Sequence, residues 1–153
     1  MIKPKRLGHL VLRVRDVNRS VEFYSQVLGL RVTGRVGDSM AFFSSTEDHH
    51  DLAVMGIGEK APGPEPDRVG LYHFAYQLGS FDELREAYRF LKEKDVNIAG
   101  LGDHGATKSL YFFDPDGNEI EVYCDAPEHE GKKLDQLFTE TGPLDLEEPA
   151  KAG

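Results

Sequence analysis

Apolar and polar residues alternate near the start of the chain, between Gly8 and Val14. This period of two, in a segment rich in branched residues, predicts a β-strand. The apolar residues that come next recur at helical spacing and are Val17, Val21, Tyr24 and Leu28. Asp16 offers a cap at the start of this predicted helix, and Gly29 supplies a stop at its end. Short strands are predicted at 31–36, 40–45 and 50–57, which makes the first unit βαβββ.

A second unit with the same plan is predicted in the second half of the chain. Its strand at 71–78 is followed by a helix that begins at an S-x-x-E capping box, formed by Ser80 and Glu83. The apolar face of this helix comprises Phe81, Leu84, Tyr88 and Leu91. Three strands follow, near residues 97–101, 109–113 and 119–124. A loop at 58–70 with three prolines separates the two units, because proline disfavours both helix and strand pairing.

The two units are related by an internal match. When the sequence is shifted on itself by 64 residues, the difference between positions 73 and 9, His9 falls on His73. The apolar pattern then stays in step through strand and helix as far as Tyr24, which falls on Tyr88. A long period that occurs only twice indicates a duplicated module.

We expect the two modules, at about 7–57 and 70–125, to form a single α+β domain over residues 1–125. Their sheets are predicted to roll into a cup-shaped, partly open β-barrel with flanking helices. Residues 126–153 are predicted as an acidic, mostly extended C-terminal tail, with seven acids against three lysines. A short amphipathic turn that docks on the domain or on a second subunit is the alternative for Leu134, Leu137 and Phe138.

Composition narrows the classes of partner. The formal net charge of −9 and the absence of a cluster of basic residues disfavour nucleic acid. No apolar stretch is long enough for a signal peptide or a membrane span, so we expect a cytoplasmic protein with no membrane partner. The single cysteine, Cys124, excludes an internal disulfide and is interpreted as a packing residue. Exposed sheet edges commonly pair, which favours a homo-oligomer.

Three residues stand out as candidate metal ligands. His9 and His73 occupy matching points of the two modules, which makes a shared function more plausible than two unrelated core histidines. Glu121 lies between two apolar residues of a predicted strand, where a carboxylate is costly to bury unless it is paired or binds a metal. Two histidines and one carboxylate suit a redox-active divalent metal with open coordination positions. Glu119 has the same strand parity and is the competing carboxylate.

The sequence resembles the vicinal oxygen chelate (glyoxalase/bleomycin resistance/dioxygenase) superfamily from Leu7 to Asp125. The stretches that carry this resemblance are 7–14 and 23–29. Within the superfamily, the chain is most similar to the type I extradiol, catechol 2,3-dioxygenase-like enzymes, in three narrower stretches at 50–53, 71–75 and 104–121. The last is the most specific, because Tyr111 precedes Glu121 by the same ten residues as in that family.

The resemblance implies an Fe(II)-dependent enzyme that cleaves a catechol-type aromatic diol with O2. The metal ligands that it implies are His9, His73 and Glu121, and Mn, Zn and Ni are the alternative metals. His50 would be the acid–base residue, because histidine titrates near neutrality, with the adjacent His49 as the alternative. His104 and Tyr111 would hydrogen-bond the substrate. The stretch between these two residues is shorter than in the two-domain members of the family.

Other members of the fold are the competing interpretations. A glyoxalase-type isomerase or lyase would need a fourth protein ligand, an acid at 52–57, and that strand has none. A fosfomycin-type thiol transferase uses the same three ligands but does not require His50, His104 and Tyr111 together. A non-enzymatic binding protein of the bleomycin-resistance type would not need the inward histidines. The sequence therefore favours the dioxygenase.

Overall fold

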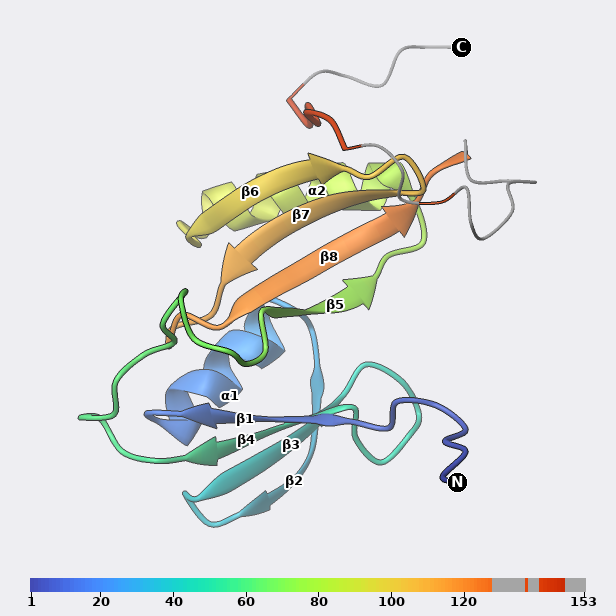
Figure 1. The fold of residues 1–153 in the computed structure, drawn as a ribbon. Helices are drawn as coiled ribbons and strands as arrows, with labels where there is room; N and C mark the ends of the chain where they lie inside the picture. The colour runs from blue at the N-terminus through green and yellow to red at the C-terminus, as the bar shows by residue number, and fades with distance from the viewer. Residues whose placement is uncertain (128–136, 138–140, 148–153) are drawn as a thin grey trace. The chain divides into compact units, whose positions relative to one another are not determined.

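The structure is a computed structural model that describes residues 1–127, 137 and 141–147 (Figure 1). The chain forms two compact units, residues 1–64 and 65–153, which are described one at a time. Each unit contains one helix and one four-stranded mixed sheet among its described residues. The predicted α+β class with two βαβββ modules is therefore confirmed, and the closure of the two sheets into a cup stays a prediction.

The first unit is built from five elements: β1 (Leu10–Val14), α1 (Val17–Gln26), β2 (Arg31–Val36), β3 (Met40–Ser44) and β4 (Leu52–Gly56). The strand order is β1-β4-β3-β2, with β1 parallel to β4 and the other pairs antiparallel. Asp16 caps α1 by accepting a hydrogen bond of 2.8 Å from the backbone N–H of Arg19. The fully buried rings of Tyr24 and Phe43 lie 5.5 Å apart and join α1 to β3.

The second unit repeats this plan with β5 (His73–Gln77), α2 (Phe81–Glu93), β6 (Ile98–Asp103), β7 (Thr107–Phe113) and β8 (Glu119–Asp125). Its strand order, β5-β8-β7-β6, is the counterpart of that in the first unit, as expected for a duplicated module. The capping box at α2 differs in one detail. Ser80 accepts from the backbone N–H of Glu83, but the Glu83 carboxylate accepts from the N–H of Gly79 and not from that of Ser80.

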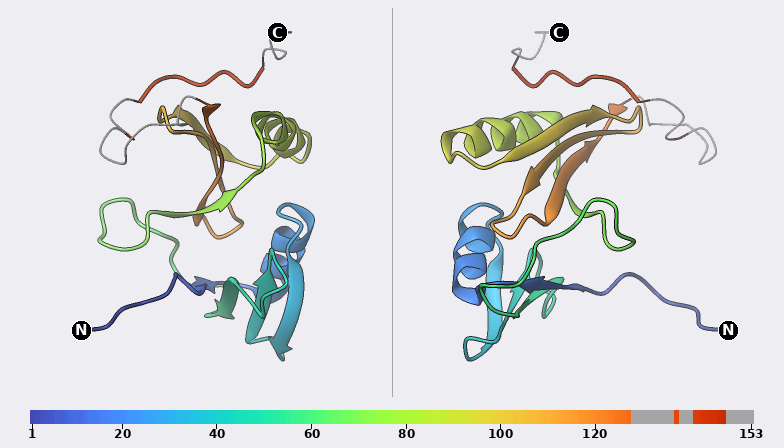
Figure 2. Two further views of the ribbon diagram at one scale, coloured as in Figure 1. Left: turned by 90° about the vertical axis from the view of Figure 1, so that its right-hand side faces the viewer. Right: turned by 60° about the vertical axis from the view of Figure 1, so that its left-hand side comes forward.

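One face of the second sheet is packed and the other carries polar side chains. Helix α2 contacts β7 and β8 and lies along one face of the sheet (Figure 2). The buried apolar residues of these two strands alternate along each strand and are Leu110, Phe112, Ile120, Val122 and Cys124. Because successive side chains of a strand point to opposite faces, Tyr111, Glu119 and Glu121 lie on the face away from these residues.

Two predicted strands begin later than expected. The segments predicted from 8 and from 50 start at Leu10 and Leu52, so His9 and His50 precede β1 and β4. The reason is the start of the backbone pairing, where the N–H of Leu10 donates to the carbonyl of Asp51 at 3.0 Å. Both histidines therefore lie just outside the ladder, at the same end of this parallel pair.

Part of the C-terminal segment docks on the second unit. Gly142 exchanges two backbone hydrogen bonds with Asp103 at the end of β6, of 3.1 and 2.8 Å. Leu146 is buried, and the Glu147 carboxylate accepts from the Tyr88 hydroxyl of α2 at 2.9 Å. Residues 141–147 are called the docked segment below. The alternative of an amphipathic turn concerned Leu134, Leu137 and Phe138, and it stays a prediction because Leu134 and Phe138 lie outside the described residues.

Truncation of Leu146 tests this docking. Leu146 is 1% exposed, so we expect Leu146→Ala to lower the free energy of unfolding by about 2–5 kcal/mol, as for other buried leucines. Leu144→Ala, at a half-buried position of the same segment, should cost less. Urea unfolding of the whole chain measures both. An unchanged midpoint for Leu146→Ala would show that the docked segment does not contribute to the fold.

Within the described part of the chain, neither helix has the length and apolar character needed to cross a membrane.

Candidate active site

Two of the predicted ligands meet on the polar face of the second sheet. His73 opens β5, and the parallel register of β5 and β8 places Ala75 opposite Glu121. The His73 Nε2 atom lies 3.1 Å from Glu121 Oε2, and the two side chains are 28% and 12% exposed. An imidazole nitrogen and a carboxylate oxygen therefore lie next to each other on this face of the sheet. This donor pair fits a divalent metal such as Fe(II).

Tyr111 and His104 extend this cluster. Tyr111 is the partner of Glu121 in the antiparallel pairing of β7 with β8. Its hydroxyl donates to Glu121 Oε1 at 3.2 Å and lies 2.8 Å from His104 Nε2. Burial raises the pKa of Tyr111, and the negative charge of Glu121 raises it further. The phenol therefore stays protonated and keeps a proton to donate.

The turn that carries His104 is fixed by its own hydrogen bonds. The Asp103 carboxylate accepts from the N–H of Gly105 at 2.9 Å and from Lys108 Nζ at 2.6 Å. Burial alone would raise the pKa of Asp103, but the hydrogen bonds from Lys108 and Gly105 outweigh it and lower that pKa. Gly105 has a φ of 73°, which a residue with a side chain rarely adopts. His104 is thus held over Tyr111 by a defined turn.

Gly102 is a site residue that the sequence analysis does not identify. A Cβ atom added at this position would lie 2.9 Å from His104 Nε2 and 3.5 Å from Tyr111 Cε2. The two rings can therefore approach each other only because residue 102 has no side chain. The one signal in the sequence is a glycine directly after the strand predicted at 97–101, because glycine in or beside a strand often marks a close approach by another group.

In the first unit, the structure brings His9 and His50 together. Their ring centroids are 4.5 Å apart, and Phe42 contacts His50 edge-on at 5.3 Å. His9 is exposed, and His50 is half-buried. The neighbouring His49 also contacts His50, with its Nδ1 atom 2.6 Å from His50 Nδ1. A predicted ligand and the predicted acid–base residue are thus in contact.

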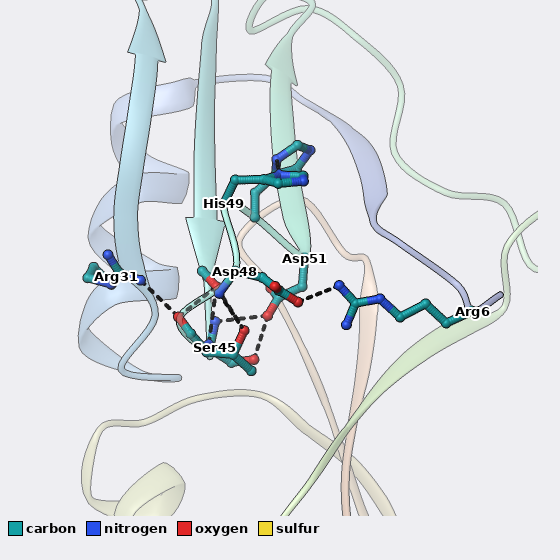
Figure 3. Close-up of polar contacts among 9 residues, drawn as sticks. Arg6, Arg31, Ser45, Asp48, His49 and Asp51 are labelled. Atoms are coloured by element: carbon teal, nitrogen blue, oxygen red, sulfur yellow. Dashed lines mark hydrogen bonds and ion pairs between the residues drawn. The ribbon is translucent and has the colours of Figure 1, made fainter.

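Polar contacts hold the loop at residues 45–51, which carries His49 and His50 (Figure 3). The Asp51 carboxylate accepts from the backbone N–H and the hydroxyl of Ser45, at 2.8 and 2.5 Å. Asp48 pairs with Arg6, and Arg31 donates to a backbone carbonyl of the loop at 2.8 Å. These contacts fix the position of the loop just ahead of β4.

The environment of His50 favours its neutral form. Partial burial lowers the pKa of His50, and the neighbouring His49 and His9 lower it further, whereas Asp51 raises it by a smaller amount. A neutral imidazole near pH 7 can accept a proton, as a general base requires.

The predicted residues thus form two clusters. The second unit holds His73, Glu121, Tyr111 and His104, and the first unit holds His9 and His50. Among the residues that the structure describes, no three His, Cys, Asp or Glu side chains gather as a complete metal site. The full ligand set, which includes His9, stays a prediction. Cys124 is buried, as expected for a packing residue.

Comparison with known proteins identifies related chains. Residues 6–122 match the family model described as Glyoxalase/Bleomycin resistance protein/Dioxygenase superfamily. Biphenyl-2,3-diol 1,2-dioxygenase 3 of Rhodococcus globerulus is 33% identical over 97% of this chain and 83% of its own length. Catechol-2,3-dioxygenase of Bacillus subtilis is 38% identical over 79% of this chain, which spans only 42% of that protein.

The fold also matches solved structures. A glyoxalase/dioxygenase from Nostoc punctiforme is 28% identical and aligns with a TM-score of 0.67, over 82% of this chain and 97% of that one.

Proposed function

The chain belongs to the glyoxalase/bleomycin resistance protein/dioxygenase superfamily, and we propose that it is an Fe(II)-dependent extradiol dioxygenase that opens the ring of a catechol-type diol with O2. The observation that carries this proposal is the contact series from His73 through Glu121 and Tyr111 to His104. It contains two proposed metal ligands followed by two hydrogen-bonding groups. The names of the two dioxygenase relatives support the same activity.

His9, His73 and Glu121 would hold the iron. When held by three protein ligands, a ferrous ion would supply open positions for the diol and O2 side by side and a path for electrons between them. The protein must then orient the diol, move its proton and keep the remaining polar groups in place.

His50 would take the proton from a diol hydroxyl. Its lowered pKa makes the neutral imidazole the main form near pH 7, and a neutral imidazole has one ring nitrogen with a lone pair that can accept a proton. Its contact with His9 puts it next to a proposed ligand. The same imidazole can return the proton later in the reaction.

Tyr111 and His104 would orient the oxygen-bearing side of the substrate. Tyr111 stays protonated and can donate a hydrogen bond, and His104 fixes the direction of that hydroxyl through their 2.8 Å contact. Such preorganised donors are most effective in a site from which water is excluded.

Two other enzyme activities of the fold fit this chain less well. Strand β4, Leu52–Gly56, has no acidic residue that could be the fourth ligand of a glyoxalase-type isomerase. A fosfomycin-type thiol transferase would leave the His104–Tyr111 pair without a function. The proposal therefore favours oxygen chemistry.

Anaerobic reconstitution tests the activity. The protein is loaded with Fe(II), mixed with a panel of catechols and exposed to air. Uptake of O2 with formation of a yellow ring-opened product is expected, and Zn(II)-loaded protein should give neither. Iron-loaded protein that consumes no O2 with any diol of the panel would contradict the proposal.

Gly102→Ala tests the placement of His104. The new Cβ would lie 2.9 Å from His104 Nε2 and must displace this ring. We expect turnover to fall about 10- to 100-fold, as for other small misplacements in active sites, with iron content unchanged. Gly100→Ala is the matched control, because a Cβ at Gly100 meets nothing within 4 Å. Equal turnover in both variants would show that the close approach of His104 to Gly102 does not contribute to turnover.

A further inference from the structure

The second nitrogen of His73 faces another carboxylate, that of Glu119. These two residues are direct partners in the parallel pairing of β5 with β8. The His73 Nδ1 atom lies 3.8 Å from Glu119 Oε1, and the Glu119 side chain is only 15% exposed. Glu121 lies at the opposite ring nitrogen, Nε2. Each ring nitrogen of His73 thus faces the carboxylate of a different glutamate of β8.

The Nδ1 atom of His73 is buried and has no hydrogen-bond partner among the residues that the structure describes. A neutral imidazole that binds a metal through Nε2 carries its proton on Nδ1, and the group that accepts this proton sets the tautomer. A buried N–H without an acceptor is costly. When a metal is bound at Nε2, the proton on Nδ1 therefore requires a hydrogen-bond acceptor. Glu119 lies on the side of the ring where this acceptor is required.

The distance is short enough for Glu119 to meet this need. A hydrogen bond from N–H to oxygen is about 2.9 Å long, so the observed 3.8 Å must shorten by about 0.9 Å. Rotation near the end of the Glu119 side chain provides such a movement without a change in the backbone pairing. The same geometry argues against Glu119 as a ligand, because it lies at Nδ1 while Glu121 lies at Nε2.

We propose that Glu119 is a positioning residue of the metal centre, which accepts the Nδ1 proton of His73 and holds the imidazole with Nε2 directed at the metal. This inference rests on the proposed function only through the metal site at His73 and Glu121. It does not depend on the substrate or on oxygen chemistry.

Metal affinity is the first test, with Zn(II) as the probe and a chromophoric chelator as competitor. Carboxylates that orient a metal-binding histidine typically contribute 10- to 100-fold to affinity, so Glu119→Ala should weaken binding by about that factor. Glu119→Gln keeps an acceptor oxygen but loses the charge, and should fall between Glu119→Ala and the unchanged protein. Asp125→Ala, an exposed acid on the same strand, should bind as the unchanged protein does.

The tautomer of His73 is the second test, because a merely structural effect would not alter it. In the Zn(II)-loaded protein, nitrogen-15 NMR of the imidazole should show a protonated Nδ1 whose proton exchanges slowly with water. This protection should persist in Glu119→Gln and be lost in Glu119→Ala. Unfolding curves for both variants confirm that the chain remains folded.

The results separate this inference from the proposed function. His73→Ala should lose Zn(II), and wild-type affinity in that variant would overturn both the metal site and the inference. If His73→Ala loses Zn(II) while Glu119→Ala binds it normally, only the role of Glu119 is overturned. Equal losses in Glu119→Gln and Glu119→Ala would also overturn it, because charge and not hydrogen bonding would then explain the effect.

Discussion

Glu121→Ala is expected to abolish the retention of iron, with affinity reduced by more than about 100-fold, which exceeds the usual effect of groups outside the ligand set. Glu121 supplies the carboxylate oxygen that lies 3.1 Å from His73 Nε2. Its removal also leaves the Tyr111 hydroxyl without one of its partners. The measurement is the iron content after anaerobic loading and desalting.

The control for Glu121→Ala is Asp125→Ala, which removes an acid from the same strand, at a position of the same parity. We expect this variant to retain iron in full. A Glu121→Ala protein that remains replete with iron would transfer the ligand role to Glu119. It would also rule out the proposed role of Glu119 as the acceptor of the Nδ1 proton of His73.

His50→Ala is expected to keep its iron and to lose turnover by about 10²- to 10⁴-fold, the range typical of a lost general base. The imidazole of His50 contacts His9, and its environment lowers its pKa and favours the neutral base. Since His50 is not among the proposed ligands, the metal content should not fall. Steady-state ring cleavage and iron analysis on the same preparation measure both quantities.

His49→Ala discriminates between the two adjacent histidines. His49 contacts the ring of His50 but is itself exposed. We therefore expect a smaller loss of turnover than for His50→Ala. If His49→Ala is the more damaging of the two, the acid–base role belongs to His49. Full activity in both variants would place proton transfer elsewhere.

The elements of this fold follow from local patterns in the sequence. Alternation predicts the strands, and helical spacing behind Asp16 and Ser80 predicts both helices at their observed starts. The match between His9 and His73 predicts that the second unit repeats the βαβββ order of the first. The strands and helices depend on residues near one another in the chain, which is why local sequence patterns predict them.

Other features depend on contacts between distant residues and leave no periodic signal. The sequence places His9 and His50 inside strands, but backbone pairing begins only at the contact between Leu10 and Asp51. The docked segment has no helical or strand pattern, and its position depends on the bridge to Asp103, the buried Leu146 and the hydrogen bond from Tyr88 to Glu147. The need for glycine at position 102 arises only when the ring of His104, from the turn after β6, and the ring of Tyr111, from β7, meet next to it.

Strand parity alone also cannot separate Glu119 from Glu121, because both point to the same face. The two acids face different nitrogens of His73, and which nitrogen each faces depends on the register between β5 and β8. A sequence pattern therefore identifies the pair, whereas the structure gives each member a distinct position.

A crystal structure of the Fe(II)-loaded protein, grown without oxygen, tests the central claim most directly. The account predicts one iron bonded to a nitrogen of His9, to Nε2 of His73 and to the carboxylate of Glu121, with the remaining positions taken by water or diol. Iron bound by other residues, or imidazoles of His9 and His73 too far apart to share one ion, would contradict it.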